Sequence, residues 1–318
     1  MGALQNSTDS SLMTDPTELV IVGSFVVAFG VFVISAIVRS VFAGRRQTVA
    51  GEDCKLMDGI PLDQVPDERF PSSAVSPSGR VPVWFYRPAD LAGAGFVFLV
   101  FGWLFSATLG VPEQPMVLNW RALLVNIGLQ FFIAGVVMVF AMSRMDLNGW
   151  LGLRWPSWRR VFLIAPGAVG FMWALFAGIQ ACGYMEWMES LGVETVQETV
   201  KLLQESEDPL ILGLMTAAAV IVAPLCEEIV FRGYFYPVLK KFGGAWPAAV
   251  CSSLVFAAAH GSLASLLPLF LFGGLLVFIY EKTGSIWAPI AVHFCFNGVT
   301  VIVQLLARYY DFPLSPAP

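Results

Sequence analysis

Long runs of apolar residues, separated by short polar segments, dominate this chain. A helix needs about 20 apolar residues to cross the roughly 30 Å hydrocarbon core of a bilayer. On that measure the sequence predicts eight transmembrane helices, near residues 19–38, 91–111, 122–143, 161–185, 210–239, 244–260, 263–280 and 285–307. His260, Gly261 and Ser262 divide the sixth helix from the seventh, because the uncharged stretch around them is too long for one span. The pattern predicts an all-α polytopic membrane protein.

Composition narrows the class further. The 318 residues are 57% hydrophobic and only 13% charged, whereas soluble domains carry about 45–50% apolar and about 25% charged residues. An ordinary soluble enzyme and a disordered protein are therefore excluded. Nucleic-acid binding has no support either, because the basic residues are spread along loop edges and form no patch.

The basic residues are distributed unequally between the two sides of the predicted bundle. If the N-terminus lies outside, 15 of the 18 Lys and Arg residues fall on the inner side, and only Arg121, Lys201 and Arg308 lie outside. Basic residues concentrate in inner loops of membrane proteins. We therefore expect an integral protein of the bacterial inner (plasma) membrane, embedded in its lipid bilayer, with both termini outside.

The loops divide the chain into six parts. These are 1–43, an outer tail with the first transmembrane helix; 44–90, an irregular Pro-rich cytoplasmic loop; 91–185, three transmembrane helices; 186–208, an acidic outer segment; 209–307, the last four helices; and 308–318, the C-terminal tail. The outer segment carries Leu191, Val196, Val200 and Leu203 at helical spacing, which predicts an amphipathic helix on the outer surface. A lid that guides substrate is the alternative interpretation.

Three charged residues lie inside the fifth predicted helix, where each costs about 2.5–3.5 kcal/mol on insertion scales. They are Glu227, Glu228 and Arg232. Glu228 and Arg232 are spaced i, i+4 and can pair along one face, while Glu227 is turned about 100° away. A structural ion pair would explain Glu228 and Arg232. It would not explain the adjacent second carboxylate, which adds repulsion and desolvation cost.

The chain has two histidines, His260 and His293, and both lie in apolar segments. Asn297 follows His293 by one helical turn and shares its face. Measured as helix rise from the inner side, Glu227, His260 and Asn297 lie at ~20, ~26 and ~18 Å, and His293 at ~12 Å. These polar groups are therefore predicted to meet at one site within the bilayer.

Three motifs occur in order, each in an apolar helix: Glu-Glu-x-x-x-Arg, Phe-x-x-x-His and His-x-x-x-Asn. Together they resemble the CPBP family, the CAAX proteases and bacteriocin-processing enzymes that are also called ABI or Rce1-like intramembrane proteases. The resemblance covers roughly residues 205–307. It implies a glutamate-dependent endopeptidase without a metal cofactor, acting on a membrane-associated protein or peptide, with its catalytic core in 209–307.

The resemblance also implies roles for individual residues. Glu227 would be the general base that activates a water held by His260, and His293 and Asn297 would stabilise the oxyanion. Glu228 and Arg232 would orient the site, and Phe256 would pack against and position the helix that carries His260.

Four alternatives stay open. A zinc peptidase would need carboxylate ligands, since the chain has two histidines and no His-Glu-x-x-His helix. Cys226 could act as a nucleophilic thiol, although nothing nearby in the sequence activates it. Intramembrane Glu, Arg and His residues also occur in proton-coupled transporters. A non-catalytic immunity or scaffold protein would keep the same fold. The substrate stays open as well: prenylated C-termini, peptide leaders and membrane-anchored sorting signals all fit.

Overall fold

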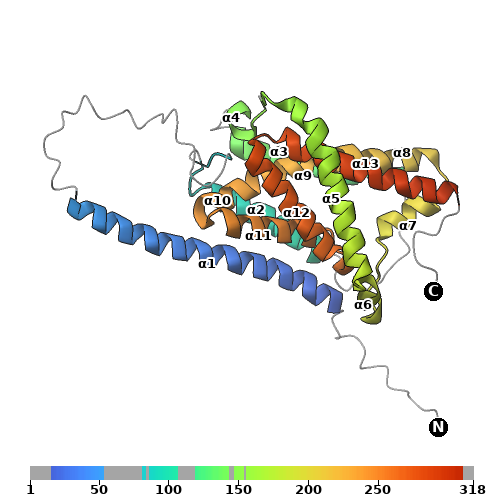
Figure 1. The fold of residues 1–318 in the computed structure, drawn as a ribbon, viewed down its shortest axis with the longest axis horizontal. Coiled ribbons are helices and arrows are strands. Elements are labelled where there is room, and N and C mark those ends of the chain that lie inside the picture. The colour runs from blue at the N-terminus through green and yellow to red at the C-terminus, as the bar shows by residue number, and fades with distance from the viewer. Residues whose placement is uncertain are drawn as a thin grey trace, which may run out of the picture.

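The computed structural model describes residues 16–53, 81–83, 86–106, 119–142, 147–153 and 155–310. Within these ranges every regular element is a helix (Figure 1), which confirms the all-α prediction. The N-terminal tail, most of the loop predicted at 44–90 and the C-terminal tail lie outside the described residues.

Among the described residues, an apolar helix occurs at each of the eight places where the apolar runs predict one. These helices are α1 (Pro16–Asp53), α2 (Asp90–Ser106), α3 (Trp120–Met142), α5 (Val161–Ala181), a continuous helix over Pro209–Gly243, α11 (Ala245–Ala258), α12 (Leu263–Thr283) and α13 (Trp287–Tyr309). Among the described residues, six helices are long and apolar enough to cross a membrane, and α2 and α11 are shorter. The protein is therefore polytopic, while the number of eight crossings stays a prediction.

The first helix is longer than predicted. It continues to Asp53, so the prediction of an irregular segment beginning at residue 44 is wrong for residues 44–53. Arg45, Arg46 and Gln47 are good helix formers, and a helix satisfies its own backbone when it leaves the bilayer. In Figure 1 this end of α1 extends well beyond the rest of the bundle.

The helix over Pro209–Gly243 is interrupted by two π-helical stretches. In order, its parts are α8 (Pro209–Ala217), η4 (Ala218–Val222), α9 (Ala223–Glu228), η5 (Ile229–Phe235) and α10 (Tyr236–Gly243). Both η4 and η5 are π-helical turns, which are found frequently at functional sites. The Gly233 carbonyl in η5 accepts hydrogen bonds from the Tyr86 hydroxyl at 3.0 Å and from Trp150 Nε1 at 2.7 Å. These two bonds tie η5 to the segment before α2 and to α4 (Leu147–Leu151).

Close packing joins α11 to α12. A Cβ atom on Gly273 of α12 would lie 3.2 Å from the Ser253 Cα of α11 and 3.3 Å from Phe256 Cδ1. Glycine at this position therefore lets the two backbones approach each other. Helix α11 also packs against α1 and α10, and α13 packs against α5 and η4. The buried residues of these helices form one continuous core around the segment 226–239.

The acidic segment predicted at 186–208 contains two short helices, α6 (Tyr184–Ser190) and α7 (Glu198–Glu205), where one amphipathic helix was predicted. The chain turns at Gly192, whose φ of 76° favours glycine, and Leu191 is left exposed. Leu203 is buried. Arg308 of α13 holds this end of α7, since its Nη1 donates to the Leu203 carbonyl at 3.2 Å and to the Ser206 carbonyl at 2.5 Å.

The beginning of α1 and the end of α13 lie on the same side of the bundle (Figure 1). A chain that crosses the membrane an even number of times has both ends on the same side. Which side faces out stays a prediction from the distribution of Lys and Arg.

Candidate active site

A buried ion pair lies at the junction of α9 and η5. Arg232 Nη1 lies 2.9 Å from Glu228 Oε1, and both side chains are 0% exposed, so the i, i+4 spacing predicted this contact correctly. Arg232 Nη2 also donates to the Gly273 carbonyl of α12 at 3.2 Å, and its guanidinium lies 4.5 Å from the centre of the Phe256 ring of α11. The pair therefore joins three helices.

His293 of α13 completes the environment of Glu228. Its Nδ1 lies 2.9 Å from Glu228 Oε1, so this oxygen accepts hydrogen bonds from both Arg232 and His293. Because a carboxylate oxygen only accepts, Nδ1 carries the hydrogen. The imidazole is buried and packs edge-on against the Phe272 ring at 5.2 Å. Glu228 thus fixes the orientation of His293.

Glu227 has different surroundings although it is the next residue. Its side chain is 22% exposed, and its Oε2 lies 3.9 Å from His293 Nε2, beyond hydrogen-bond distance. Among the described residues this buried oxygen has no hydrogen-bond partner. We call Glu227, Glu228, Arg232 and His293 the carboxylate cluster. In this cluster, Glu228 accepts two hydrogen bonds through Oε1 and is fully buried, whereas Glu227 is partly exposed; Oε2 of each carboxylate lacks a hydrogen-bond partner among the described residues.

His260 lies just after the end of α11 and is exposed. Its Nδ1 lies 2.8 Å from the Phe256 carbonyl, which only accepts, so Nδ1 carries the hydrogen and Nε2 of the neutral ring is an acceptor. The Phe256 ring lies 4.9 Å from the His260 ring and 6.0 Å from the His293 ring, centre to centre. Phe256 is therefore the common neighbour of both histidines and of Arg232.

Asn297 is bonded to the same long helix that carries the carboxylates. Its Nδ2 donates to the Ala219 carbonyl at 2.8 Å, and Ala219 lies in η4. An asparagine amide has two N–H groups, so one donor is left for another acceptor. The structure thus brings six of the seven predicted site residues together: the four of the carboxylate cluster, Phe256 and His260. The seventh, Asn297, is connected to them through its bond to η4.

Residues 209–299 match the family model described as type II CAAX prenyl endopeptidase Rce1-like. This segment is Rce1-like. The resemblance predicted from the three motifs is thereby confirmed, and all seven predicted site residues fall within the matched segment.

Two curated relatives share part of the chain. "Putative membrane peptidase YdiL" of Bacillus subtilis (strain 168) is 32% identical over 136 residues, which are 43% of this chain and 54% of the relative. "Uncharacterized 24.3 kDa protein" of Escherichia coli is 31% identical over 134 residues, which are 40% of this chain and 58% of the relative. The chain thus spans little more than half the length of these relatives. No solved structure matches.

Sequence reasoning missed the groups that hold the Rce1-like segment from outside it. Trp150 Nε1 lies 3.0 Å from the Tyr86 hydroxyl, and both groups bond the carbonyl of Gly233, the residue after Arg232. Trp150 and Tyr86 are almost fully buried. Their sequence context resembles that of aromatic residues at a membrane surface, so only the fold reveals this role.

The alternative of a zinc peptidase would require a set of metal-ligating side chains. No group of three or more His, Cys, Asp or Glu side chains there is arranged to hold a metal ion. Whether the reaction is metal-free stays a prediction.

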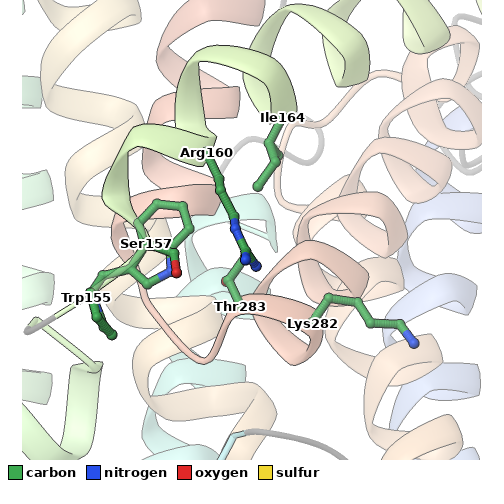
Figure 2. Close-up of a pocket in the computed structure, with 7 residues that line it drawn as sticks. Trp155, Ser157, Arg160, Ile164, Lys282 and Thr283 are labelled. Atoms are coloured by element: carbon green, nitrogen blue, oxygen red, sulfur yellow. The ribbon is translucent and has the colours of Figure 1, made fainter.

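A cavity of about 380 Å³ lies away from these residues, between the start of α5 and the end of α12 (Figure 2). None of the predicted site residues lines it. It therefore belongs to a different part of the molecule from the carboxylate cluster.

Proposed function

We propose that the chain is an intramembrane endopeptidase that hydrolyses a peptide bond of a membrane-associated protein or peptide. The observation that carries this proposal is the contrast between two adjacent carboxylates. Glu228 is fully buried and its Oε1 is bonded to Arg232 and His293, whereas the Glu227 side chain is 22% exposed and its Oε2 lies 3.9 Å from His293 Nε2, too far for a hydrogen bond. A structural ion pair requires only a buried, hydrogen-bonded carboxylate such as Glu228. A general base requires a carboxylate that water can reach, such as Glu227.

In the proposed reaction the Glu227 carboxylate takes a proton from a water molecule, and the resulting hydroxide attacks the carbonyl carbon of the peptide bond. The carbon–nitrogen bond then breaks, and Glu227 returns the proton to the leaving amine. One water molecule is consumed, and one carboxyl and one amino terminus are formed. General acid–base catalysis of this kind contributes typically 10²–10⁴-fold to the rate.

The neighbouring groups suit the roles that the resemblance implies. The acceptor Nε2 of His260 can take a hydrogen bond from the water and orient its lone pair. Asn297 keeps one amide N–H for a developing oxyanion. His293 donates Nδ1–H to Glu228, so it can also donate Nε2–H to an oxyanion only as the doubly protonated ring.

The test compares the peptide termini of membrane proteins in cells that express wild-type protein, Glu227→Gln or Cys226→Ala. Glu227→Gln removes the base and keeps the side-chain size, and we expect it to abolish the new termini. Cys226→Ala is the matched control: it is the preceding buried residue, and its change removes the thiol alone. New termini that persist in Glu227→Gln would contradict the proposal, and loss only in Cys226→Ala would favour a thiol nucleophile. An unchanged cell phenotype in Glu227→Gln would favour a scaffold.

The proposed reaction uses no metal ion. We expect cleavage by purified protein to survive excess chelator, and elemental analysis to find zinc far below one equivalent per chain. Chelator-sensitive cleavage that returns on addition of zinc would instead support a peptidase with carboxylate and histidine ligands.

A further inference from the structure

The cavity between α5 and α12 has a mixed apolar and polar lining that includes two cationic side chains. Its labelled residues in Figure 2 are Trp155, Ser157, Arg160, Ile164, Lys282 and Thr283. We call this cavity the basic pocket. The two charged residues in its wall, Arg160 and Lys282, are both positive, and neither forms an ion pair with a described residue.

Among the described residues, no acidic side chain forms an ion pair with Arg160 or Lys282. The nearest acidic residue along α12 is Glu281, and its Oε1 lies 2.5 Å from Lys240 Nζ and 2.7 Å from the Tyr236 hydroxyl. Glu281 therefore bonds to side chains of α10 and not to Arg160 or Lys282. Figure 2 shows the side chain of Arg160, the residue before α5, extending toward Thr283, while the Lys282 side chain points away from Arg160.

The wall of the basic pocket is held in place by backbone contacts. The Ile286 amide donates to the Leu151 carbonyl at 2.9 Å, and Trp287 Nε1 donates to the Leu153 carbonyl at 3.2 Å. A Cβ atom on Gly152 would lie 1.9 Å from the Gly284 carbonyl oxygen, so the two loops touch directly. These contacts set the end of α12 opposite the start of α5 before any ligand arrives.

The surroundings are those of a membrane surface. Trp158 is exposed beside the pocket, and Phe162 and Leu163 on the next turn of α5 are 69% and 79% exposed. Ile164 continues this apolar surface into the pocket. Because α5 is an apolar helix long enough to cross a bilayer, acyl chains would contact this surface while the pocket lies at headgroup level. Basic pockets between transmembrane helices bind anionic headgroups in this way.

We propose that the basic pocket binds a phosphate group carried by an anionic lipid, with Arg160 and Lys282 contacting the phosphate. Arginine suits this role because its planar fork of N–H donors matches phosphate oxygens. The cavity volume of about 380 Å³ accommodates a glycerophosphate headgroup. The site is separate from the carboxylate cluster, so this proposal does not depend on the proposed peptidase activity.

The test measures lipid binding and needs no substrate. Full-length protein is reconstituted in nanodiscs of phosphatidylcholine with or without phosphatidylglycerol, and the lipids retained after transfer to detergent are counted by native mass spectrometry. We expect wild-type protein to retain phosphatidylglycerol in preference to phosphatidylcholine. Arg160→Gln and Lys282→Gln should each weaken this preference about fivefold, as expected for loss of one basic contact near a membrane surface.

Arg159→Gln is the matched control. Arg159 carries the same charge one residue away, lies over the Trp158 ring at 5.8 Å and does not line the pocket. We expect it to leave retention unchanged within about twofold. An equal loss in Arg159→Gln, or no loss in the double variant of Arg160 and Lys282, would overturn the proposal. Displacement of the lipid by millimolar inorganic phosphate would overturn the assignment to a lipid.

Discussion

The buried ion pair of Glu228 and Arg232 makes a quantitative prediction about stability. Both side chains are 0% exposed and lie 2.9 Å apart. Removing one partner leaves the other as an uncompensated buried charge, which costs about 3–5 kcal/mol. Arg232→Met leaves Glu228 with His293 as its donor, and Glu228→Gln leaves Arg232 with the Gly273 carbonyl. We expect each single variant to lose about 3 kcal/mol of unfolding free energy, the lower end of this range, because these contacts remain.

The double variant Glu228→Gln/Arg232→Met decides between an ion pair and two independent polar groups. Coupled neighbours show interaction energies of about 0.5–3 kcal/mol, whereas neutral hydrogen bonds between transmembrane helices average about 0.6 kcal/mol. We expect a coupling of about 2 kcal/mol, so that the double variant is less destabilised than the sum of the single ones. Equilibrium unfolding in mixed micelles titrated with dodecyl sulfate measures all four states.

The pair of Lys240 and Glu281 serves as the control. Lys240 is buried and Glu281 is 15% exposed, with 2.5 Å between Nζ and Oε1, and the pair lies outside the carboxylate cluster. The same cycle on Lys240→Met and Glu281→Gln should lower stability and leave cleavage intact in the folded fraction. A coupling near zero for Glu228 and Arg232, or single variants within about 1 kcal/mol of wild type, would refute the inference that a buried charge is being compensated.

Three further predictions concern the scaffold. Gly93→Ala should destabilise the protein by about 1–3 kcal/mol, because its Cβ would lie 2.2 Å from the Tyr234 hydroxyl. Gly95→Ala should be tolerated, since nothing lies within 4 Å of the Cβ that it adds. Thermal unfolding compares the two variants. Trp150→Phe removes the donor of two buried hydrogen bonds and should cost about 1–3 kcal/mol in the micelle titration. Arg308→Gln releases two carbonyls at the end of α7, so amide exchange in α7 should accelerate about tenfold by mass spectrometry, while exchange in α11 stays unchanged.

Apolar runs predicted the helices well because, in a bilayer, length and hydrophobicity alone select the spanning segments. The prediction was wrong where the chain leaves the apolar phase. Helix α1 continues to Asp53, since a helix in water needs no apolar residues. The outer segment divides at Gly192, where φ is positive, although the apolar spacing around Leu191 and Leu203 is helical. Hydrophobic periodicity does not detect a single backbone turn of this kind.

Within the site, contacts along one helix were predictable and contacts between helices were not. The pair of Glu228 and Arg232 follows from i, i+4 spacing. The hydrogen bond of His293 to Glu228 instead depends on how α13 is rotated against α9. Counting helix rise indicated only that these groups lie at similar depths, and no spacing indicates which carboxylate the imidazole reaches.

The division of roles between the two carboxylates therefore comes from tertiary structure. Glu227 and Glu228 are identical side chains on consecutive residues, and helical geometry separates them by about 100°. Arg232, His293 and the Gly273 carbonyl gather on the side of Glu228, and the π-helical turn that follows α9 has its own carbonyl anchored from outside the Rce1-like segment. In the proposed reaction, charge compensation on the side of Glu228 leaves the Glu227 carboxylate to exchange the proton. A single Glu at this position would have to choose between holding Arg232 and activating water, which is a physical reason for the pair.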